Sequence, residues 1–394
     1  MNYVLLVEAV LCSSIFVIHS FLAFGIIKAR IVDRRQFSKA LRDVEFAKKG
    51  SSKDEIFKVS VIVAAMNEEN NLPALLNSLA NQRKSDFEVV LVNDRSTDET
   101  PLILEQFRSS SDLLVKIIHN KVNPVGCNGK QQALDLGLSL ARGNLFLVTD
   151  ADCIVPPDWV ESMERYFSDK NLGAVFGQLK VNSGKSFISR YQAFDQPLVH
   201  QYSTGTAGLG IPTSCFGNNL GFRAEVIRTL GGFKALGYTL TEDAALIEAT
   251  QRLGWRVRVA TLPETEVITE SQPDWNSFVN QHIRWNSGAF FSKSLLAGGA
   301  YKYIVLFLIF SILAIPFSAL FSWLLWMPLT SLVSIGMLGL LSVLLYNNNR
   351  TKYLLVCKFI PYTMFFMMFY SWVSVLAILG VKTNWKGQRL SRKI

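Results

Sequence analysis

Two kinds of hydrophobic pattern divide the chain. Long apolar runs occupy its ends, over residues 3–27, 303–346 and 353–381. A run of roughly 18 or more apolar residues is long enough to cross a bilayer. Between these runs, residues 56–270 alternate short apolar stretches with amphipathic ones, which is typical of a soluble α/β domain. The pattern therefore predicts a globular domain flanked by membrane segments.

The short apolar stretches of the middle region predict β-strands. We expect strands at residues 59–65, 87–92, 115–118, 145–148, 173–180 and 255–260. Helical patterns separate most of them, and this alternation predicts a parallel sheet with right-handed crossovers. Residues 203–221 are rich in Gly, Ser and Thr, so we expect either a plain connector or a mobile binding loop there.

Polar side chains follow three of the predicted strands directly. Asn67 and Glu68 come after the first strand, Asp94 after the second, and Asp150 and Asp152 after the fourth. Open α/β sheets bind their ligands at the carboxyl ends of such strands. Two carboxylates one residue apart are hard ligands suited to Mg²⁺ or Mn²⁺, and a metal there could bridge a diphosphate. A solvated acidic turn explains an isolated D-x-D equally well.

The common nucleotide-binding fingerprints do not account for these clusters. No G-x-G-x-x-G follows the first strand, which disfavours a dinucleotide fold of that type. Asn128-Gly129-Lys130 opens a predicted helix. Because Gln131 follows, and not Ser or Thr, this segment is not a Walker P-loop.

A second acidic motif, Thr241-Glu242-Asp243, opens a helix predicted at residues 244–253. Thr241 suits an N-cap, and acids in a first turn complement the helix dipole. Helix capping alone would explain both carboxylates, so the motif by itself does not indicate catalysis.

Residues 274–296 predict an amphipathic helix. On it, Gln281, Arg284 and Trp285 are spaced i, i+3 and i+4, so they share one face. In isolation, an Arg beside a Trp is more often ordinary amphipathic packing than a binding site.

The first apolar run predicts a transmembrane helix and not a cleaved signal peptide. No basic region precedes it, and no small-x-small cleavage site ends it. Lys28, Arg30, Arg34 and Arg35 follow directly, so the positive-inside rule predicts that the next part of the chain is cytoplasmic. Residues 28–55 are basic with interleaved apolar positions, which fits a juxtamembrane helix on anionic lipid and a solvated linker equally well.

Charge and cysteine content narrow the function class. The net charge is +9, but much of the excess lies beside the apolar runs, so a membrane surface is a better partner than nucleic acid. The five cysteines are odd in number and show no C-x-x-C spacing. Neither a zinc site nor a disulfide framework is indicated, which fits a reducing compartment.

The C-terminal topology is left open by the pattern. Three full passes from a cytoplasmic domain would leave the basic residues 382–394 outside, against the positive-inside rule. The conflict disappears if one of the C-terminal runs is interfacial or re-entrant. The sequence does not say which one.

Together the motifs resemble a known family. In chain order stand residues 59–65, Asn93-Asp94-Arg95-Ser96, Asn128-Gly129-Lys130, Asp150-Ala151-Asp152, Thr241-Glu242-Asp243 and Gln281-His282-Ile283-Arg284-Trp285. This order resembles the membrane-bound family 2 glycosyltransferases, the group with cellulose, chitin and hyaluronan synthases and ceramide glucosyltransferase. Each motif alone is weak, but Q-x-x-R-W after D-x-D and T-E-D is a strong signal. The resemblance covers roughly residues 56–300.

The resemblance implies an α/β fold of the GT-A, Rossmann-like type. The expected protein is an integral membrane protein with a cytoplasmic catalytic domain, one N-terminal helix and about three C-terminal transmembrane or interfacial helices. The implied order is a transmembrane helix at residues 1–27, a basic linker at 28–55, the GT-A domain at 56–270, an amphipathic interface helix at 271–300, a membrane region at 301–381 and a basic tail at 382–394.

The resemblance also implies how the donor, a UDP-sugar, would be bound. Asp94 would hydrogen-bond the uracil base, and the loop from Ala65 through Asn67 to Glu68 would border the nucleotide. Lys130 would lie near the donor phosphates. The acids of the D-x-D, Asp150 and Asp152, would hold the donor through Mg²⁺ or Mn²⁺.

For the transfer step, the resemblance implies that Asp243 is the general base. Gln281 and Arg284 would contact the diphosphate, and Trp285 would floor the acceptor pocket. Acceptor contacts are also implied for Glu242, Gly217 and Asn218. The last two belong to Phe216-Gly217-Asn218-Asn219, which departs from the F-x-G-T-x pattern of the processive synthases and puts their polymerising mode in doubt.

The chemistry of sugar transfer agrees with this set of residues. The charge of the leaving diphosphate must be neutralised, the attacking hydroxyl must lose a proton to a positioned base, and both partners must be held in line. One carboxylate base without a second, nucleophilic carboxylate implies direct displacement with inversion at the anomeric carbon. An α-linked donor would then give a β-linked product.

Three functions compete on the sequence. The first is an inverting, metal-dependent transfer from a UDP-sugar to a membrane lipid at the cytoplasmic face. The second is a processive polysaccharide synthase with a glycan acceptor, which is disfavoured because about three C-terminal segments are few for a polymer channel. The third is a non-catalytic membrane scaffold, against which the intact Asp152, Asp243 and Arg284 argue.

Overall fold

The chain forms two units with separate cores. The computed structural model describes residues 2–47, 58–292, 294–345, 352, 355–385 and 388–390. The sheet unit comprises Lys28–Asn182 and Gly210–Glu270, and the helical unit comprises Met1–Ile27, Ser183–Leu209 and Ser271–Ile394. The stretch Ser183–Leu209 lies inside the range predicted for the GT-A domain, yet it clusters with the helical unit.

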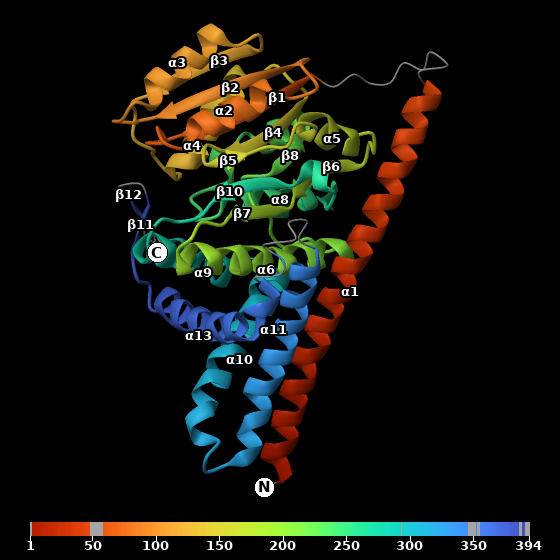
Figure 1. The fold of residues 1–394 in the computed structure, drawn as a ribbon, viewed down its shortest axis with the longest axis vertical. Coiled ribbons are helices and arrows are strands. Elements are labelled where there is room, and N and C mark those ends of the chain that lie inside the picture. The colour runs from red at the N-terminus through yellow and green to blue at the C-terminus, as the bar shows by residue number, and fades with distance from the viewer. Residues whose placement is uncertain are drawn as a thin grey trace. The chain divides into compact units, whose positions relative to one another are not determined.

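A seven-stranded sheet carries the sheet unit (Figure 1). Its order is β3 (Leu114–Asn120), β2 (Phe87–Asp94), β1 (Val59–Ala65), β4 (Leu145–Asp150), β8 (Leu220–Arg223), β6 (Leu172–Gly177) and β9 (Arg256–Ala260). The prediction of a parallel sheet is confirmed for the pairings among β3, β2, β1 and β4 and for β6 with β9, but β8 pairs antiparallel with both β4 and β6. A smaller sheet has the order β5 (Cys153–Ile154), β10 (Val267–Glu270) and β7 (Leu179–Asn182).

Helices cover both faces of the large sheet, because the strand residues alternate between two apolar layers. Val61 and Val63 face a core that includes Leu75 and Trp159, whereas Ile62 lies against Gly137 on the other face. The helices and 3₁₀ turns of this unit are α2 (Leu72–Ala80), α3 (Thr100–Ser110), α4 (Gly129–Leu140), α5 (Trp159–Tyr166), α7 (Ala224–Leu230), η1 (Lys234–Leu236), α8 (Glu242–Arg252) and η2 (Pro263–Thr265).

The helical unit contains the long apolar segments. Its elements are the first part of α1 (Asn2–Ala47), α6 (Phe187–Leu209), α9 (Trp275–Phe290), α10 (Leu295–Phe317), η3 (Ser322–Leu325), α11 (Trp326–Leu344), α13 (Phe359–Ile378), β11 (Thr383–Trp385) and β12 (Gln388–Leu390). Four stretches are long and apolar enough to cross a membrane: Tyr3–Arg35, Leu296–Phe317, Ser322–Leu344 and Phe359–Ile378. The predicted set of one N-terminal and three C-terminal apolar helices is therefore confirmed.

The prediction of a loop from residue 203 is wrong for its first part. Ser203, Thr204 and Gly205 are buried in the last turns of α6. Small residues are common in loops, but they are also enriched where two apolar helices approach closely. The composition of this segment reflects the second cause.

A close crossing of α1 and α6 explains the small residues. A methyl group at Gly25 would fall 2.1 Å from the carbonyl oxygen of Gly205, and one at Gly205 would fall 2.8 Å from the carbonyl oxygen of Leu22. Nearby, His19 donates through Nδ1 to the Ile15 carbonyl (2.9 Å), and its Nε2 accepts from the Tyr202 hydroxyl (3.0 Å). The crossing thus combines backbone contact with one buried polar pair.

The predicted basic linker begins as a continuation of α1, which runs to Ala47. Within it, Asp33 is buried and accepts from the backbone and hydroxyl of Thr261 (2.7 and 2.8 Å) and from Arg258 (3.3 Å). Asp33 is therefore packed inside the sheet unit, to which this part of α1 belongs. Residues 48–57 lie outside the described residues.

We expect Gly205→Ala to destabilise the protein, because the new methyl group must push apart two helix backbones. Overpacking of this kind costs about 1–3 kcal/mol. The measurement is the thermal unfolding midpoint in detergent. Gly299→Ala in α10 is the matched control, since its methyl group would meet no atom within 4 Å. An unchanged midpoint for Gly205→Ala would contradict the close crossing.

Candidate active site

The carboxyl ends of four adjacent strands bring the predicted donor residues to one edge of the sheet. Asp94 of β2 is in register with Asn120 of β3, and Ala65 of β1 is in register with Asn93. On the other side of β1, Ala64 is in register with Asp150 of β4. Neighbouring strands are about 4.8 Å apart, so Asp94 and Asp150 are separated by two strand spacings, about 10 Å. A ligand with two chemically different ends suits this arrangement.

Two residues beside this edge adopt a backbone conformation that L-residues rarely use. Asn67 after β1 has φ 53°, and Arg95 after β2 has φ 60°. They are the non-glycine residues with positive φ in the described part of the chain. Such strain persists only where surrounding contacts enforce it, and it clusters at functional sites. Both positions therefore mark this edge as the place to look for a ligand.

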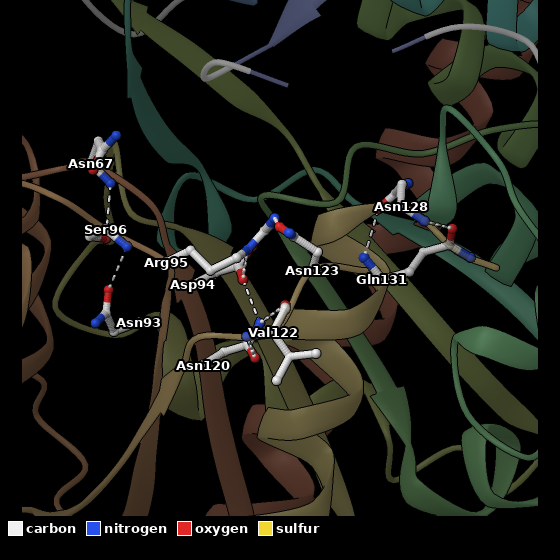
Figure 2. Close-up of polar contacts among 10 residues, drawn as sticks. All are labelled: Asn67, Asn93, Asp94, Arg95, Ser96, Asn120, Val122, Asn123, Asn128 and Gln131. Carbon is white, nitrogen blue, oxygen red and sulfur yellow. Dashed lines mark hydrogen bonds and ion pairs between the residues drawn. The ribbon is translucent and has the colours of Figure 1, made fainter. Parts of the chain in front are cut away.

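Hydrogen bonds tie the loops after β1 and β2 together (Figure 2). The Asn67 N–H donates to Ser96 Oγ (3.0 Å), and Asn67 Oδ1 accepts from the Thr97 N–H (2.8 Å). The Ser96 N–H donates to Asn93 Oδ1 (3.3 Å). The strained Asn67 is thus fixed from both sides.

Asp94 is nearly fully buried and is anchored by its neighbour. Arg95 donates from Nε and Nη2 to its two carboxylate oxygens (2.9 and 2.7 Å), and Asn120 Nδ2 donates to Oδ1 (2.7 Å). The other nitrogen of the guanidinium, Nη1, donates to Asn123 Oδ1 (3.1 Å), as Figure 2 shows. The carboxylate therefore has a fixed position and a compensating charge.

Glu68 and Ala65, also predicted to border the nucleotide, lie at the end of β1. Ala65 is buried, which leaves its backbone as the group able to meet a ligand. Glu68 is buried too: its N–H donates to Thr100 Oγ1 (2.8 Å), and its Oε2 accepts from Asn71 Nδ2 (3.0 Å). Its described contacts thus hold the start of α2.

The start of α4 is fixed by a reciprocal capping box. Asn128 Oδ1 accepts from the Gln131 N–H (2.7 Å), and Gln131 Oε1 accepts from the Asn128 N–H (3.0 Å). The same side chains reach the loop that leads to α8, because Asn128 Nδ2 donates to the Thr239 carbonyl (2.7 Å) and Gln131 Nε2 to the Gly237 carbonyl (2.8 Å). Sequence reasoning missed these two roles, although the N-x-x-Q spacing was a signal for them.

Lys130, the second residue of α4, joins the two acidic motifs. Its Nζ lies 2.7 Å from Asp150 Oδ1 and 3.4 Å from Glu242 Oε1. Burial alone would lower the pKa of Lys130, but the carboxylates of Asp150, Glu242 and Asp243 raise it above its ordinary value. The ammonium therefore stays charged and holds D-x-D and T-E-D at one place.

Asp243 accepts two backbone hydrogen bonds. Its Oδ2 accepts from the Gly217 N–H and its Oδ1 from the Ala244 N–H, both at 2.8 Å. Burial and the adjacent charge of Glu242 raise the pKa of Asp243 to about 6, although Lys130 and these N–H groups act in the opposite direction. A carboxylate with this pKa ionises close to neutral pH, as a general base must.

The other acid of the motif, Glu242, is almost completely buried beside Lys130 and Asn128. Asn128 Nδ2 donates to its Oε2 at 3.4 Å. Its described contacts are thus with the start of α4, and its acceptor role stays a prediction.

The loop that carries Gly217 and Asn218 is pinned by the next residue. Asn219 is fully buried, donates to the carbonyls of Gln178 (2.9 Å) and Thr265 (2.8 Å), and accepts from Trp159 Nε1 (3.0 Å). This role was not predicted. Gly217 suits its position because a methyl group there would fall 3.2 Å from Cβ of Asp243.

A divalent metal fits the D-x-D by its chemistry. Asp150 and Asp152 offer carboxylate oxygens beside the charged Lys130. Among the described residues, no group of three or more His, Cys, Asp or Glu is placed to hold a metal ion. Mg²⁺ in nucleotide sites is commonly held by one or two carboxylates, with phosphate oxygens and water as the other ligands. These residues would therefore hold a metal together with a diphosphate and not alone.

The Q-x-x-R-W residues lie on α9 in the helical unit. Gln281 is buried, and its Oε1 has no hydrogen-bond partner among the residues that the structure describes. Arg284 and Trp285 are half-buried. At 100° per residue, these three side chains lie on one side of a second stripe, formed by Phe278, His282 and Asn286, all of which are buried. The buried stripe therefore sets the direction of the Q-x-x-R-W face.

A buried acid–imidazole pair anchors that stripe. His282 Nε2 lies 2.8 Å from Asp195 Oδ2 of α6, and both side chains are fully buried. His282 Nδ1 lies 2.9 Å from the Phe278 carbonyl, which can only accept, so Nδ1 carries a proton. The imidazole thus joins the Phe278 carbonyl to the Asp195 carboxylate of α6. Sequence reasoning missed this pair because its members are 87 positions apart.

Comparisons with known proteins match this chain to glycosyltransferases. Residues 60–231 match the family described as Glycosyl transferase family 2. An uncharacterized glycosyltransferase of Haemophilus influenzae is 30% identical over 231 residues, which cover 57% of this chain and 68% of that protein. A beta-monoglucosyldiacylglycerol synthase of Nostoc sp. is 28% identical over 240 residues, which cover 59% of this chain and 49% of the synthase. The matched part spans about half the length of this synthase and of several other relatives.

One solved structure supports the fold. The mannosyltransferase PcManGT from Pyrobaculum calidifontis, in complex with GDP-Man and Mn²⁺, has a TM-score of 0.51 and 18% identity. The likeness covers 90% of this chain and 99% of that protein. It confirms the predicted GT-A-like α/β architecture, and at this identity it carries no statement about donor or metal.

We expect the Asp195–His282 pair to show strong coupling in a double-mutant cycle. Asp195→Asn or His282→Gln alone leaves one member buried without its partner, which costs about 3–5 kcal/mol. The double variant should lose less than the sum of the two. The measurement is the free energy of unfolding of the purified protein. Tyr191→Phe is the control, because its hydroxyl contact to Asp195 is long (3.3 Å). Additive losses would show that the pair is not coupled.

Proposed function

Because this chain belongs to glycosyl transferase family 2, we propose that it transfers a sugar from a UDP-sugar to a membrane lipid, with inversion and with the help of Mg²⁺ or Mn²⁺. The observation that carries the proposal is the cluster around Lys130, which gathers the acids of D-x-D and T-E-D. The catalytic domain would act at the cytoplasmic face of the membrane.

The proposed transfer is a single displacement. Asp243 takes the proton of the acceptor hydroxyl, the oxygen attacks the anomeric carbon, and the bond from that carbon to the diphosphate oxygen breaks. The fixed position of Asp243 between two backbone N–H groups and its pKa of about 6 support this role. The proposal includes no second carboxylate as nucleophile, so the configuration inverts.

The charge of the leaving diphosphate would be met by cationic groups. Asp150 and Asp152 would hold a divalent metal against the phosphate oxygens, and such a metal supplies Lewis-acid stabilisation of the leaving group. Lys130 supports the phosphate side of the site because its ammonium lies beside Asp150. Gln281 and Arg284 would contact the same diphosphate, and Trp285 the acceptor.

The base of the donor would be read by Asp94, two strand spacings from Asp150. Its carboxylate is held by Arg95 and Asn120, so it can present an acceptor at a defined position. The N3–H of uracil suits such an acceptor. Guanine also offers donors, its N1–H and its 2-amino group, so the test must include GDP-sugars as well as UDP-sugars.

A lipid acceptor is supported by the chain's membrane segments and by one relative. Four stretches are apolar enough to span a membrane, and the Nostoc relative is named for a diacylglycerol product. A processive polysaccharide synthase is the second candidate. The two differ in product length, since a lipid transferase adds one sugar and a synthase builds a polymer.

The deciding experiment incubates the purified protein in lipid vesicles with UDP- and GDP-sugars and Mg²⁺ or Mn²⁺. Extracted lipids are then analysed by mass spectrometry. We expect one added hexose on a lipid from a UDP-sugar. A polymer ladder would replace the lipid transferase with the synthase. Exclusive use of GDP-sugars would contradict the assignment of a UDP-sugar donor. If no nucleotide were released with any donor, the proposal that the protein catalyses sugar transfer would be wrong.

Asp152→Asn should lose most activity, because it keeps the side-chain shape but removes a formal charge from the proposed metal site. We expect at least about a 100-fold lower rate, the scale typical of a lost charge-stabilising group. Nucleotide release at several metal concentrations measures this. Asp158→Asn is the control, since Asp158 pairs with the exposed Arg83. Normal turnover of the wild-type protein in excess chelator would rule out the metal role.

The pH dependence of kcat/KM tests the base. Asp243 acts when ionised, so the rate should rise with pH through about 6 and level off above it. Asp243→Asn should lower the rate by roughly 100-fold or more with donor binding kept. Glu242→Gln should cost less and move the acidic limb to lower pH, because it removes a charge that raises the pKa of Asp243.

Lys130→Met should move the same limb to higher pH, since Lys130 lowers that pKa. Glu248→Gln is the control, because Glu248 lies on α8 with Asp243 but farther from its start. This variant should leave the pH profile unchanged. If the limb stays in place in both the Glu242 and Lys130 variants, Asp243 is not the group that titrates.

A further inference from the structure

Helix α13 is apolar enough to span a membrane, but it runs beside α9. Trp275 lies near Phe365 (ring centroids 5.9 Å apart), and Phe278 stacks on Phe369 (4.9 Å). Farther on, Asn286 Oδ1 accepts from the Ser374 hydroxyl (2.8 Å). From Trp275 to Asn286, α9 rises about 16 Å, and from Phe365 to Ser374, α13 rises about 14 Å. The two helices thus run side by side in the same direction for about three turns.

The same helix crosses one end of the α10–α11 hairpin. At its start, Phe359 lies against Gly339, near the C-terminal end of α11, where a methyl group would fall 3.3 Å from the Phe359 ring. Later, Ser374 shares Asn286 with the Tyr301 hydroxyl, near the N-terminal end of α10. These two ends lie together, because a short turn joins the antiparallel helices at their other ends. Figure 1 shows α13 drawn across the hairpin and not along it.

The chain after α13 stays beside α9. The strand β11 (Thr383–Trp385) packs against α9, and Thr383 is buried. If α13 crossed the bilayer, α9 beside it would have to enter the bilayer too. That helix begins at the N-cap Asp274 and carries the exposed Asn276 and the half-buried Arg284, and charged groups are costly at the bilayer centre.

One face of α13 is apolar and uncovered. Its members are spaced three or four residues apart and are 38–72% exposed: Ile360, Met364, Met368, Trp372, Val375 and Leu379. An exposed stripe of this size requires a non-aqueous partner. A spanning helix at the rim of a bundle would have a similar stripe, so the direction of α13 decides what covers it.

We propose that α13 does not cross the membrane but lies in its plane, with this stripe immersed at the boundary of head groups and acyl chains. The occupant is the lipid bilayer, because α13 packs on both helices of the α10–α11 hairpin, whose exposed surface is also apolar. Of the helices that the structure describes, α1, α10 and α11 then cross. The basic tail then begins, at Lys382, on the side where α10 begins, which satisfies the positive-inside rule.

This arrangement has a consequence for the site, which rests on the proposed function. The buried stripe of α9 is held by α13 and α6, and the Q-x-x-R-W face is its neighbour on the same helix. An in-plane α13 would fix that face at a constant depth near the bilayer surface, where the head group of an acceptor lipid lies.

Sidedness of two cysteines tests the proposal. With the exposed Cys357 replaced by serine, one cysteine is placed at Ala319, in the turn between α10 and α11, and another is appended after Ile394. Each is labelled with a membrane-impermeant maleimide in sealed vesicles, and both must label after permeabilisation. We expect the two positions on opposite sides of the membrane. Labelling from the same side would mean that α13 spans, and the proposal would be wrong.

Depth along the stripe gives an independent result. Nitroxide labels at Ile360, Met368 and Leu379 should report the same depth in the lipid within about 5 Å, from their accessibility to oxygen and to a water-soluble nickel chelate. A spanning helix would change depth by about 28 Å over these 19 positions. The exposed Leu306, Phe310 and Phe317 of α10 serve as the control and should show such a gradient.

Labels on α13 that are shielded from both reagents would show that protein covers the stripe, and this too would overturn the proposal. Neither measurement uses activity. A failed topology test therefore leaves the proposed transfer standing, and an inactive protein leaves the topology test valid.

Discussion

The candidate site depends on one half-buried ammonium. Lys130 compensates the carboxylates of Asp150, Glu242 and Asp243, which would repel one another if they were gathered without it. These acids come from β4 and from the start of α8, far apart in sequence. Their meeting requires that α4 start at a fixed place and that the loop before α8 return to it. The capping box of Asn128 and Gln131 satisfies both conditions, because its side chains bond the helix start and that loop at once.

Neutral amide side chains do the rest of the positioning. Asn219 holds the loop that delivers the Gly217 N–H to Asp243, and Asn120 holds Asp94. An amide can donate and accept without bringing a charge that would shift the pKa of the nearby acids. The pKa of Asp243 is then set by burial, by the charges of Glu242 and Lys130 and by the N–H groups of Gly217 and Ala244.

The sequence predicts what depends on local periodicity. The apolar runs predicted most of the strands of the large sheet, and the polar residues expected at their carboxyl ends do lie along one edge of it. Features that depend on distant partners were not predictable. Antiparallel β8 is four residues long with a glycine, and the end of α6 has a loop-like composition. The Asp195–His282 pair has no local pattern, whereas the N-x-x-Q of the capping box did have one and was overlooked.

The same distinction applies to the membrane segments. Length and hydropathy show whether a helix is long and apolar enough to span a membrane. By these two criteria α13 resembles α10 and α11. They do not measure direction, which is set by packing partners. The partners of α13 are α9 along one side and the two ends of a hairpin beneath it. A helix held by those contacts cannot also lie parallel to the hairpin, so its apolar surface must meet the bilayer from the side. The conflict between three C-terminal apolar runs and a basic tail then disappears.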